Sequence, residues 1–159
     1  MTPTSTTALT PWAVHTALAY RPVIRLVSET ADHGAIPHHA LTSTLSDLSR
    51  TQIRRAIRRA DSLHLLRRTP TSSALSPAGE ELADVYEAVA RWARQHNYPA
   101  PFWDFADRVH LALDLLTAEP RPIAGHAFAG HNAAERMLTD WITHHAQSML
   151  PGGPSEGRA

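Results

Sequence analysis

Arginine side chains crowd one segment in the middle of this chain. Seven of them lie between residues 49 and 68, with Asp61 as the only acidic residue there, which gives this segment a net charge of +6. The remaining eight arginines and fourteen acidic residues give −6, so the protein as a whole is neutral. A focused basic segment in a neutral protein indicates a specific polyanion-binding surface. Arginine suits that role because its guanidinium group binds phosphate or guanine in a bidentate manner.

The spacing within this segment predicts a helix with one cationic face. Ser49 and Gln52 have the spacing of a capping box, which satisfies the first N–H groups of a helix. The apolar positions recur at helical intervals: Ile53, Ala56, Ile57, Ala60 and Leu63. On the opposite side of the same helix lie Thr51, Arg54, Arg55, Arg58 and Ser62. We therefore expect the apolar stripe to be buried and the arginines to point outward.

The elements around this helix have recognisable start and stop signals. A helical segment is predicted over residues 10–34, broken or kinked at Pro22. A short helix follows from about Pro37, and residues 46–48 form a turn. Two short strands at 65–69 and 73–76 predict a β-hairpin, after which Ser76 and Pro77 start another helix. This order predicts a mainly α fold with a small β-hairpin wing, as in a winged helix-turn-helix domain with a C-terminal helical extension.

The same stretch is similar in sequence to a known group of proteins. The run Leu48–Ala60, continued by Leu65–Arg68, resembles the recognition helix and first wing strand of the HxlR and MarR families of bacterial winged-helix regulators. The motif ALSPAG at 74–79 is similar to the exit from their wing, and the helix at 82–92 resembles the HxlR pattern. The resemblance covers residues 12 to 96. It implies a homodimer that binds a roughly palindromic operator.

Position on the helix divides the polar residues into two expected roles. A recognition helix reads base edges with the N-terminal and outward part of its surface, while flanking cations neutralise phosphates. The residues expected to read bases are Thr51, Gln52, Arg54, Arg55 and Arg58. The residues expected to contact phosphate are Ser49, Arg50, Arg59, Arg67 and Arg68.

The domain organisation follows from the composition at the two ends. We expect a flexible N-terminus over residues 1–11, the winged domain over 12–96, a helical extension over 100–150 and a disordered Gly/Pro/Ser tail over 151–159. In the extension, helices are predicted at 102–116 and around 138–149, the latter capped by Asn132, with a linker at 119–122. Five aromatic residues are candidates for a dimer interface or, as the alternative, an effector pocket: Trp12, Phe102, Trp103, Phe105 and Trp141.

Several function classes find little support. The chain has no cysteine, which removes disulfides, thiolate metal sites and thiol nucleophiles, and it has no nucleophile elbow or P-loop. Of the eleven histidines, the C-terminal ones, His126, His131, His144 and His145, lack a metal-binding spacing. We therefore expect no enzyme, no metal and no cofactor. There is no stretch of 18 apolar residues and no signal peptide at the N-terminus, so we expect a cytoplasmic protein without a membrane partner.

These observations predict a sequence-specific DNA-binding transcriptional regulator. We expect it to act as a repressor that binds a palindromic operator in double-stranded DNA as a homodimer, with a small-molecule effector as a further partner. The alternative is a non-specific nucleoid or plasmid-maintenance protein that uses the same basic helix. A small helical metal-binding module or enzyme that uses the C-terminal histidines is less favoured.

Overall fold

Helices make up most of the computed structural model, which describes residues 11–100, 103–117 and 133–146. Its elements are α1 (Pro11–Leu18), α2 (Arg21–His33), β1 (Ile36–Pro37), a 3-10 turn (His38–Ala40), α3 (Leu41–Thr44), α4 (Arg50–Ser62), β2 (Leu66–Arg68), β3 (Ser72–Leu75), α5 (Pro77–Gln95), α6 (Phe105–Thr117) and α7 (Ala133–Ala146). The prediction of a mainly α fold with a small antiparallel sheet is confirmed.

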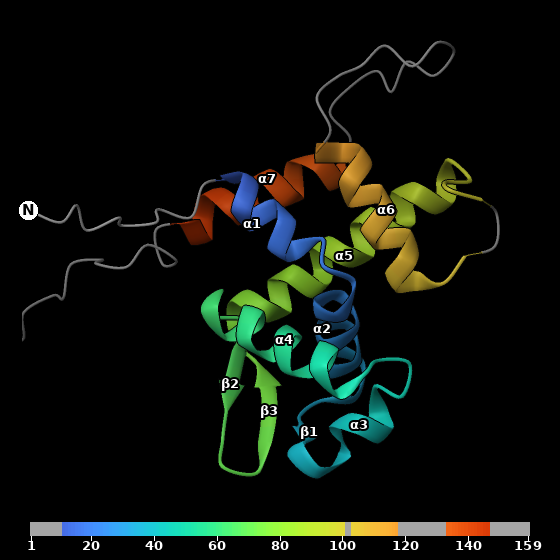
Figure 1. Ribbon diagram of the computed structural model, residues 1–159. Helices are drawn as coiled ribbons and strands as arrows, with labels where there is room; N and C mark the ends of the chain where they lie inside the picture. Colours follow the sequence, from blue (N-terminus) through green and yellow to red (C-terminus); the bar gives the residue numbers. More distant parts are fainter. Residues whose placement is uncertain (1–10, 101–102, 118–132, 147–159) are drawn as a thin grey trace, which may run out of the picture.

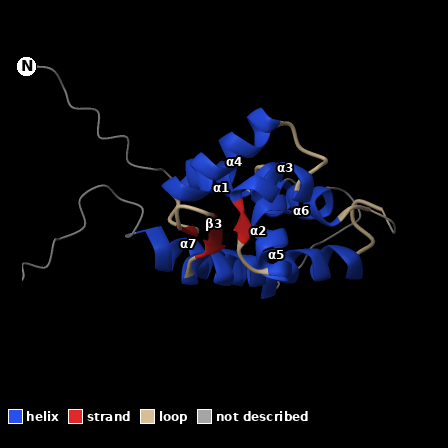
Figure 2. Ribbon diagram, turned by 90° about the horizontal axis from the view of Figure 1, so that it is seen from below, coloured by secondary structure: helices blue, strands red, loops and turns tan. Residues whose placement is uncertain are grey.

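Helix α2 occupies the centre of the structure. Figure 1 shows the sheet and α3 at one end and α6 and α7 at the other, with α2 between them. Figure 2 shows α4 and α5 on opposite sides of α2, and both helices pack against it. Four of its side chains are fully buried: Val23, Ile24, Leu26 and Val27. They spread over a wide arc of the helix, as expected for a helix packed on two sides.

The break before α2 has a local cause. Pro22 stands in the first turn of α2, where its missing N–H costs no hydrogen bond, and Tyr20 before it is extended. The helix ends at Gly34, whose φ of 82° is favourable for glycine and whose N–H donates to the Thr30 carbonyl. The predicted break at Pro22 is therefore confirmed.

The three strands form one antiparallel sheet in the order β1-β3-β2. Leu66 lies opposite Leu75 in the predicted hairpin, with strand bounds slightly different from those expected. Strand β1 was not predicted; its Ile36 pairs with Ser73 on the other side of β3. Two residues are too short to show the alternation that reveals a strand. The short helix accordingly begins after Pro37, and its Leu41 is buried.

A cluster of charges fixes the turn between α3 and α4. Arg25 of α2 donates through Nε and Nη2 to the Asp47 carboxylate, and Arg21 donates from one turn earlier at 3.1 Å. Arg21 also binds Asp107 of α6. Arg25 reaches Glu29 within its own helix at 2.8 Å. Residues from α2, the turn and α6 are thus joined by one network of ion pairs, which we call the Asp47 clamp.

The clamp shifts the acidity of its members. Hydrogen bonds from Arg25 lower the pKa of Asp47 to about 2, although partial burial works in the opposite direction. The hydrogen bond to Asp47 raises the pKa of Arg25. Burial acts to lower the pKa of Arg21, but its hydrogen bonds to Asp107 and Asp47 outweigh burial and raise it. All three groups are therefore charged at neutral pH.

Helix α5 begins in very close contact with the sheet. The Ser76 hydroxyl caps it by accepting from the Gly79 N–H at 3.1 Å, and Pro77 follows the cap as predicted. A Cβ at Gly79 would lie 2.2 Å from the Leu65 carbonyl oxygen, which is backbone and has little freedom to move. Gly79 thus allows α5 to approach the chain that leads into β2.

The C-terminal helices complete the same hydrophobic core. Both α6 and α7 pack against α5, and their buried Val109, Leu113 and Leu138 belong to one cluster with the core of α2. The prediction that α6 starts at Phe102 is wrong, since the helix begins at Phe105. Asp104 explains the difference, because its carboxylate accepts from the N–H groups of the first turn.

Several predictions fall on parts of the chain outside the described residues. These are most of the flexible N-terminus at 1–11, the linker at 119–122, the Asn132 cap and the tail at 151–159. Helix α7 ends at Ala146, so the last part of the helix predicted around 138–149 also lies outside the described residues. Within the described residues, no helix combines the length and apolar character needed to cross a bilayer.

Replacing Asp47 by asparagine should remove the charged part of the clamp. The Asp47 side chain is 37% exposed, so solvent screening limits the expected loss to about 1 kcal/mol of unfolding free energy at pH 7. A carboxyl whose pKa is lowered on folding stabilises the protein above its unfolded pKa of about 3.9, and this contribution disappears as the pH falls toward the folded value. Urea unfolding at pH 7 and near pH 2 should therefore show the difference between the two proteins only at pH 7.

Asp32→Asn is the matched control, because Asp32 is exposed and has no ion pair in the described part of the chain. Its unfolding free energy should change by less than about 0.5 kcal/mol. An equal loss in both variants, or a loss that persists at low pH, would contradict the role of the clamp.

Gly79→Ala should destabilise the protein, since the added methyl group meets the Leu65 carbonyl. We expect a loss of about 1–3 kcal/mol in unfolding free energy, although alanine is the better helix former. Gln95→Ala at the exposed end of α5 serves as control and should change stability by less than about 0.5 kcal/mol. A Gly79→Ala protein that is more stable in urea unfolding would disprove the close contact.

Candidate nucleic-acid interface

Helix α4 is held on the protein by its apolar stripe. Ile53, Ala56 and Ala60 are buried at 4% exposure or less, and Leu63 just after the helix is also buried. Ile57 is partly buried at the edge of the stripe. The stripe packs against α2, so the opposite side of α4 must face away from the protein. The predicted burial of this face is confirmed.

The N-terminus of α4 has the predicted capping box. The Ser49 hydroxyl accepts from the Gln52 N–H at 3.1 Å, and the Gln52 side-chain carbonyl accepts from the Ser49 N–H at 2.9 Å. Two N–H groups that a helix leaves without partners are thereby satisfied. Both residues were expected to contact DNA: Gln52 at a base and Ser49 at a phosphate. In the structure each already has a local partner, and Gln52 keeps only its amide N–H groups for an outside ligand.

The outward face of α4 is cationic and exposed. It carries Arg50, Thr51, Arg54, Arg55 and Arg58, all of them exposed to solvent. Over the residues that the structure describes, none of these four guanidinium groups has a hydrogen bond or ion pair. Charges of one sign on adjacent turns repel one another, and this repulsion is relieved by an anionic partner. We call this set the outer face of α4.

The other three arginines of the basic segment have partners within the protein. Arg59 is partly buried, with its guanidinium carbon 4.2 Å from the centre of the Tyr20 ring. Arg68 forms an ion pair with Asp61 at 2.9 Å. Arg67 donates to the Leu75 carbonyl across the hairpin at 3.4 Å. Of the four arginines expected to contact phosphate, three have a partner within the protein, and Arg50 has none among the described residues.

The hairpin follows α4 directly, which places its arginines near the end of that helix. His64 leaves α4 with φ of 56°, and the Leu65 N–H donates back to the Ala60 carbonyl at 2.9 Å. Strand β2 begins one residue later, and the ion pair between Arg68 and Asp61 connects it to α4. This ion pair places Arg68 of β2 beside the C-terminal end of α4.

The aromatic candidates that the structure describes differ in exposure. Trp103 is 49% exposed before α6, and Phe105 is partly buried against the core. Trp141 is buried on α7, and its indole N–H donates to the Ala78 carbonyl at 3.0 Å. Trp12 falls in α1 but its side chain is outside the described part, as is Phe102 altogether.

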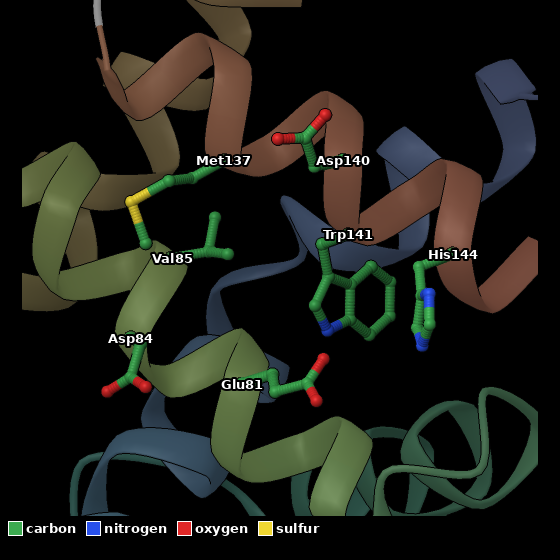
Figure 3. Close-up of a pocket in the computed structure, with 7 residues that line it drawn as sticks. All are labelled: Glu81, Asp84, Val85, Met137, Asp140, Trp141 and His144. Atoms are coloured by element: carbon green, nitrogen blue, oxygen red, sulfur yellow. The ribbon is translucent and has the colours of Figure 1, made fainter.

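Trp141 borders an open cavity of about 450 Å³ between α5 and α7. Figure 3 shows its ring directed toward α5 and Met137 reaching over Val85. Acidic side chains surround the cavity, among them Glu81, which binds His145 at 2.8 Å. The charge here is opposite to that of α4, so this surface repels nucleic acid.

The histidines do not assemble into a metal site where the structure describes them. Over those residues, no group of three or more histidine or acidic side chains could hold an ion. His145 is engaged with Glu81, and His144 is exposed beside the cavity. His126 and His131 lie outside the described residues.

Sequence reasoning missed the residues that position α4 from a distance. Asp47 and its two arginine partners lie 22 and 26 residues apart along the chain. Tyr20, which contacts Arg59, is still more remote in sequence, since 39 positions separate the two residues. Neither contact leaves a periodic pattern or a short motif, so no signal in the single sequence could have revealed it.

Ser49→Ala should weaken the start of α4 by removing the acceptor for the Gln52 N–H. We expect the unfolding free energy to fall by about 1 kcal/mol, which is typical of a lost N-cap. Ser46→Ala provides the control, since Ser46 is exposed in the preceding turn and has no side-chain hydrogen bond in the described part of the chain. Equal urea unfolding midpoints for both variants and the parent protein would show that the box contributes nothing.

Comparison with family models, curated proteins and solved structures found no match in any of the three. Function is therefore inferred from the chemistry and placement of the side chains, above all from the outer face of α4.

Proposed function

We propose that the protein binds double-stranded DNA sequence-specifically through α4 and acts as a transcriptional regulator of the winged helix-turn-helix type. One observation carries this proposal: four arginines project from a helix whose other side is buried, and they have no partner among the described residues. Free guanidinium groups on one helix face match the acceptors of guanine and phosphate.

The geometry of α4 suits insertion into a major groove. That groove accepts an α-helix, and the base edges are recognised by side chains at the N-terminal and outward positions of the helix. Thr51, Arg55 and Arg58 lie nearest the middle of the outer face, opposite the buried stripe. These residues, together with Arg54, are our candidates for base contacts, while Arg50 at the helix start is our candidate for phosphate.

The order of elements supports the winged helix-turn-helix assignment. Helix α3, a turn and α4 are followed by the β2–β3 hairpin, as in such a domain. Arg67 and Arg68 of the hairpin would contact phosphates beside the groove. Arg68 would then exchange its exposed ion pair with Asp61 for a phosphate, which costs little because surface ion pairs are weak.

A homodimer would let two copies of α4 read the halves of a palindromic operator. Trp103 and Met137 are the large apolar side chains most exposed in the described part of the chain, at 49% and 37%. Met137 lies on α7 and Trp103 just before α6, so the C-terminal helices are our candidate for the contact between the two copies. Repression by such a dimer, through occupation of its operator, is the simplest regulatory outcome.

Non-specific DNA binding is the second candidate, because the same outer face would neutralise phosphates on any duplex. The two candidates differ in the ratio of affinities for selected and random DNA. Selection of bound duplexes from a random pool, followed by titration at fixed salt, separates them. Enrichment of one motif with at least about 10³-fold tighter binding than random DNA supports the regulator. Enrichment of no motif supports the non-specific protein.

Arg55→Ala and Arg58→Ala should each weaken binding to the selected duplex. The expected loss is about 1–3 kcal/mol, or about 5- to 150-fold in Kd, because each removes a contact to a base. Arg91→Ala is the matched control: Arg91 is exposed on α5, remote from α4 in the sequence, and has no partner in the described part of the chain. Unchanged affinity of both α4 variants in a titration at fixed salt would remove α4 from the interface.

A further inference from the structure

A small cavity lies behind α4, where that helix meets α1 and α6. Its volume is about 230 Å³, and it is separate from the larger cavity between α5 and α7. The polar side chains that shape it include His15 of α1, Arg59 of α4 and His110 of α6, with Tyr20 and Asp114 beside them. It thus gathers cationic or proton-binding groups from three helices.

Arg59 presents a free edge in this cavity. Its guanidinium carbon lies 4.2 Å from the centre of the Tyr20 ring, in a cation–π contact that uses no N–H group as a hydrogen-bond donor to a polar atom. The N–H groups point outward from the edge of the guanidinium plane, and they have no hydrogen-bond partner among the described residues. A guanidinium held in this way is ordered before a ligand arrives, which lowers the entropic cost of binding.

Two histidines line other sides of the cavity, and His15 has a donor for a ligand. His15 is partly buried, and burial lowers its pKa, so its ring is neutral at pH 7 with one N–H to donate. No side-chain partner is found for it in the part of the chain that the structure describes. His110 is oriented by a hydrogen bond between its Nδ1 and the Ala19 carbonyl, and its Nε2 lies 3.6 Å from Asp114.

We propose that this cavity is a binding site for a small oxyanion, a carboxylate or phosphate group that Arg59 and His15 hold, with the His110 ring beside it. The site goes beyond DNA binding and does not depend on it. The volume is below the roughly 300 Å³ at which sites for drug-sized ligands begin, so the ligand has few atoms.

The charge balance favours an anion over a cation. Among the described residues, Asp114 is the only carboxylate that lines the cavity, and its side chain is 57% exposed beside His110. A cation would face Arg59 directly, at a place where partial burial strengthens repulsion. An anion meets one permanent positive charge and two imidazole groups, and it also favours protonation of His15.

The test uses the full-length protein without DNA. Sodium acetate and sodium phosphate are titrated at constant ionic strength, balanced with chloride, while the ring signals of His15 and His110 are followed by NMR. We expect saturable shifts of both rings with one of these anions, at a Kd of about millimolar, since so few ligand atoms can contribute little affinity. The anion that saturates the rings identifies the ligand class as carboxylate or phosphate.

Arg59→Gln should weaken this binding at least tenfold, while Arg91→Gln, which removes an arginine elsewhere, should leave it unchanged. Tyr20→Phe keeps the ring beneath Arg59 and should bind as the parent protein does. If Arg59→Gln fails to fold, His15→Asn takes its place, with the same tenfold loss read at His110. Shifts that never saturate with either anion, or that persist unchanged in Arg59→Gln or in its replacement His15→Asn, overturn the proposal. The outcome does not bear on the outer face of α4, because no DNA is present.

Discussion

The orientation of α4 depends on the Asp47 clamp and on the apolar stripe together. The stripe fixes which side of the helix faces α2. It does not fix the direction in which the helix leaves the turn, since small apolar residues such as Ala56 and Ala60 tolerate several crossing angles. The clamp supplies that second constraint, because Arg21 and Arg25 hold Asp47 two residues before the Ser49 cap.

The same ion pairs help to explain why the positive charge is concentrated on α4. Arg21, Arg25, Arg68 and Arg94 each bind a carboxylate, so much of the charge outside the outer face is neutralised locally. Acidic side chains gather instead around the cavity between α5 and α7. A neutral protein thereby keeps a strongly cationic helix at one side. Such a distribution orients the whole molecule toward a polyanion before contact is made.

Local signals allowed most of the structure to be predicted from the sequence. The capping box at Ser49, the stripe from Ile53 to Leu63 and the break at Pro22 all involve residues a few positions apart, and each was found. The start of α6 was misplaced, although Asp104 carried a usable cap signal that the apolar Phe102 obscured. Strand β1 was not predicted because it forms by pairing with β3, which is distant in the sequence and leaves no local pattern.

For the candidate site, the spacing of the arginines correctly placed them on one helix but could not assign each of them a partner. Arg55 and Arg59 show why. They are identical residues one turn apart, yet Arg55 is exposed and Arg59 lies over Tyr20. Four residues advance a helix by slightly more than one turn, so the two side chains diverge by about 40°. This difference in direction leaves Arg55 in solvent and brings Arg59 to Tyr20. The position of Tyr20 is known only from the structure, so the sequence alone could not distinguish the two arginines.

Helix α4 therefore has two polar surfaces, the outer face and the side that carries Arg59. The outer face carries cations without partners, and the Arg59 side borders the cavity with His15 and His110. If a ligand that displaces Arg59 also moved the backbone of this turn, Arg55 would move with it. The effect would then be reciprocal: a ligand of the outer face would change the affinity of the cavity by the same factor by which an occupant of the cavity changes the affinity of the outer face. Arg59 is thus the residue through which an occupant of the cavity and a ligand of the outer face would act on each other.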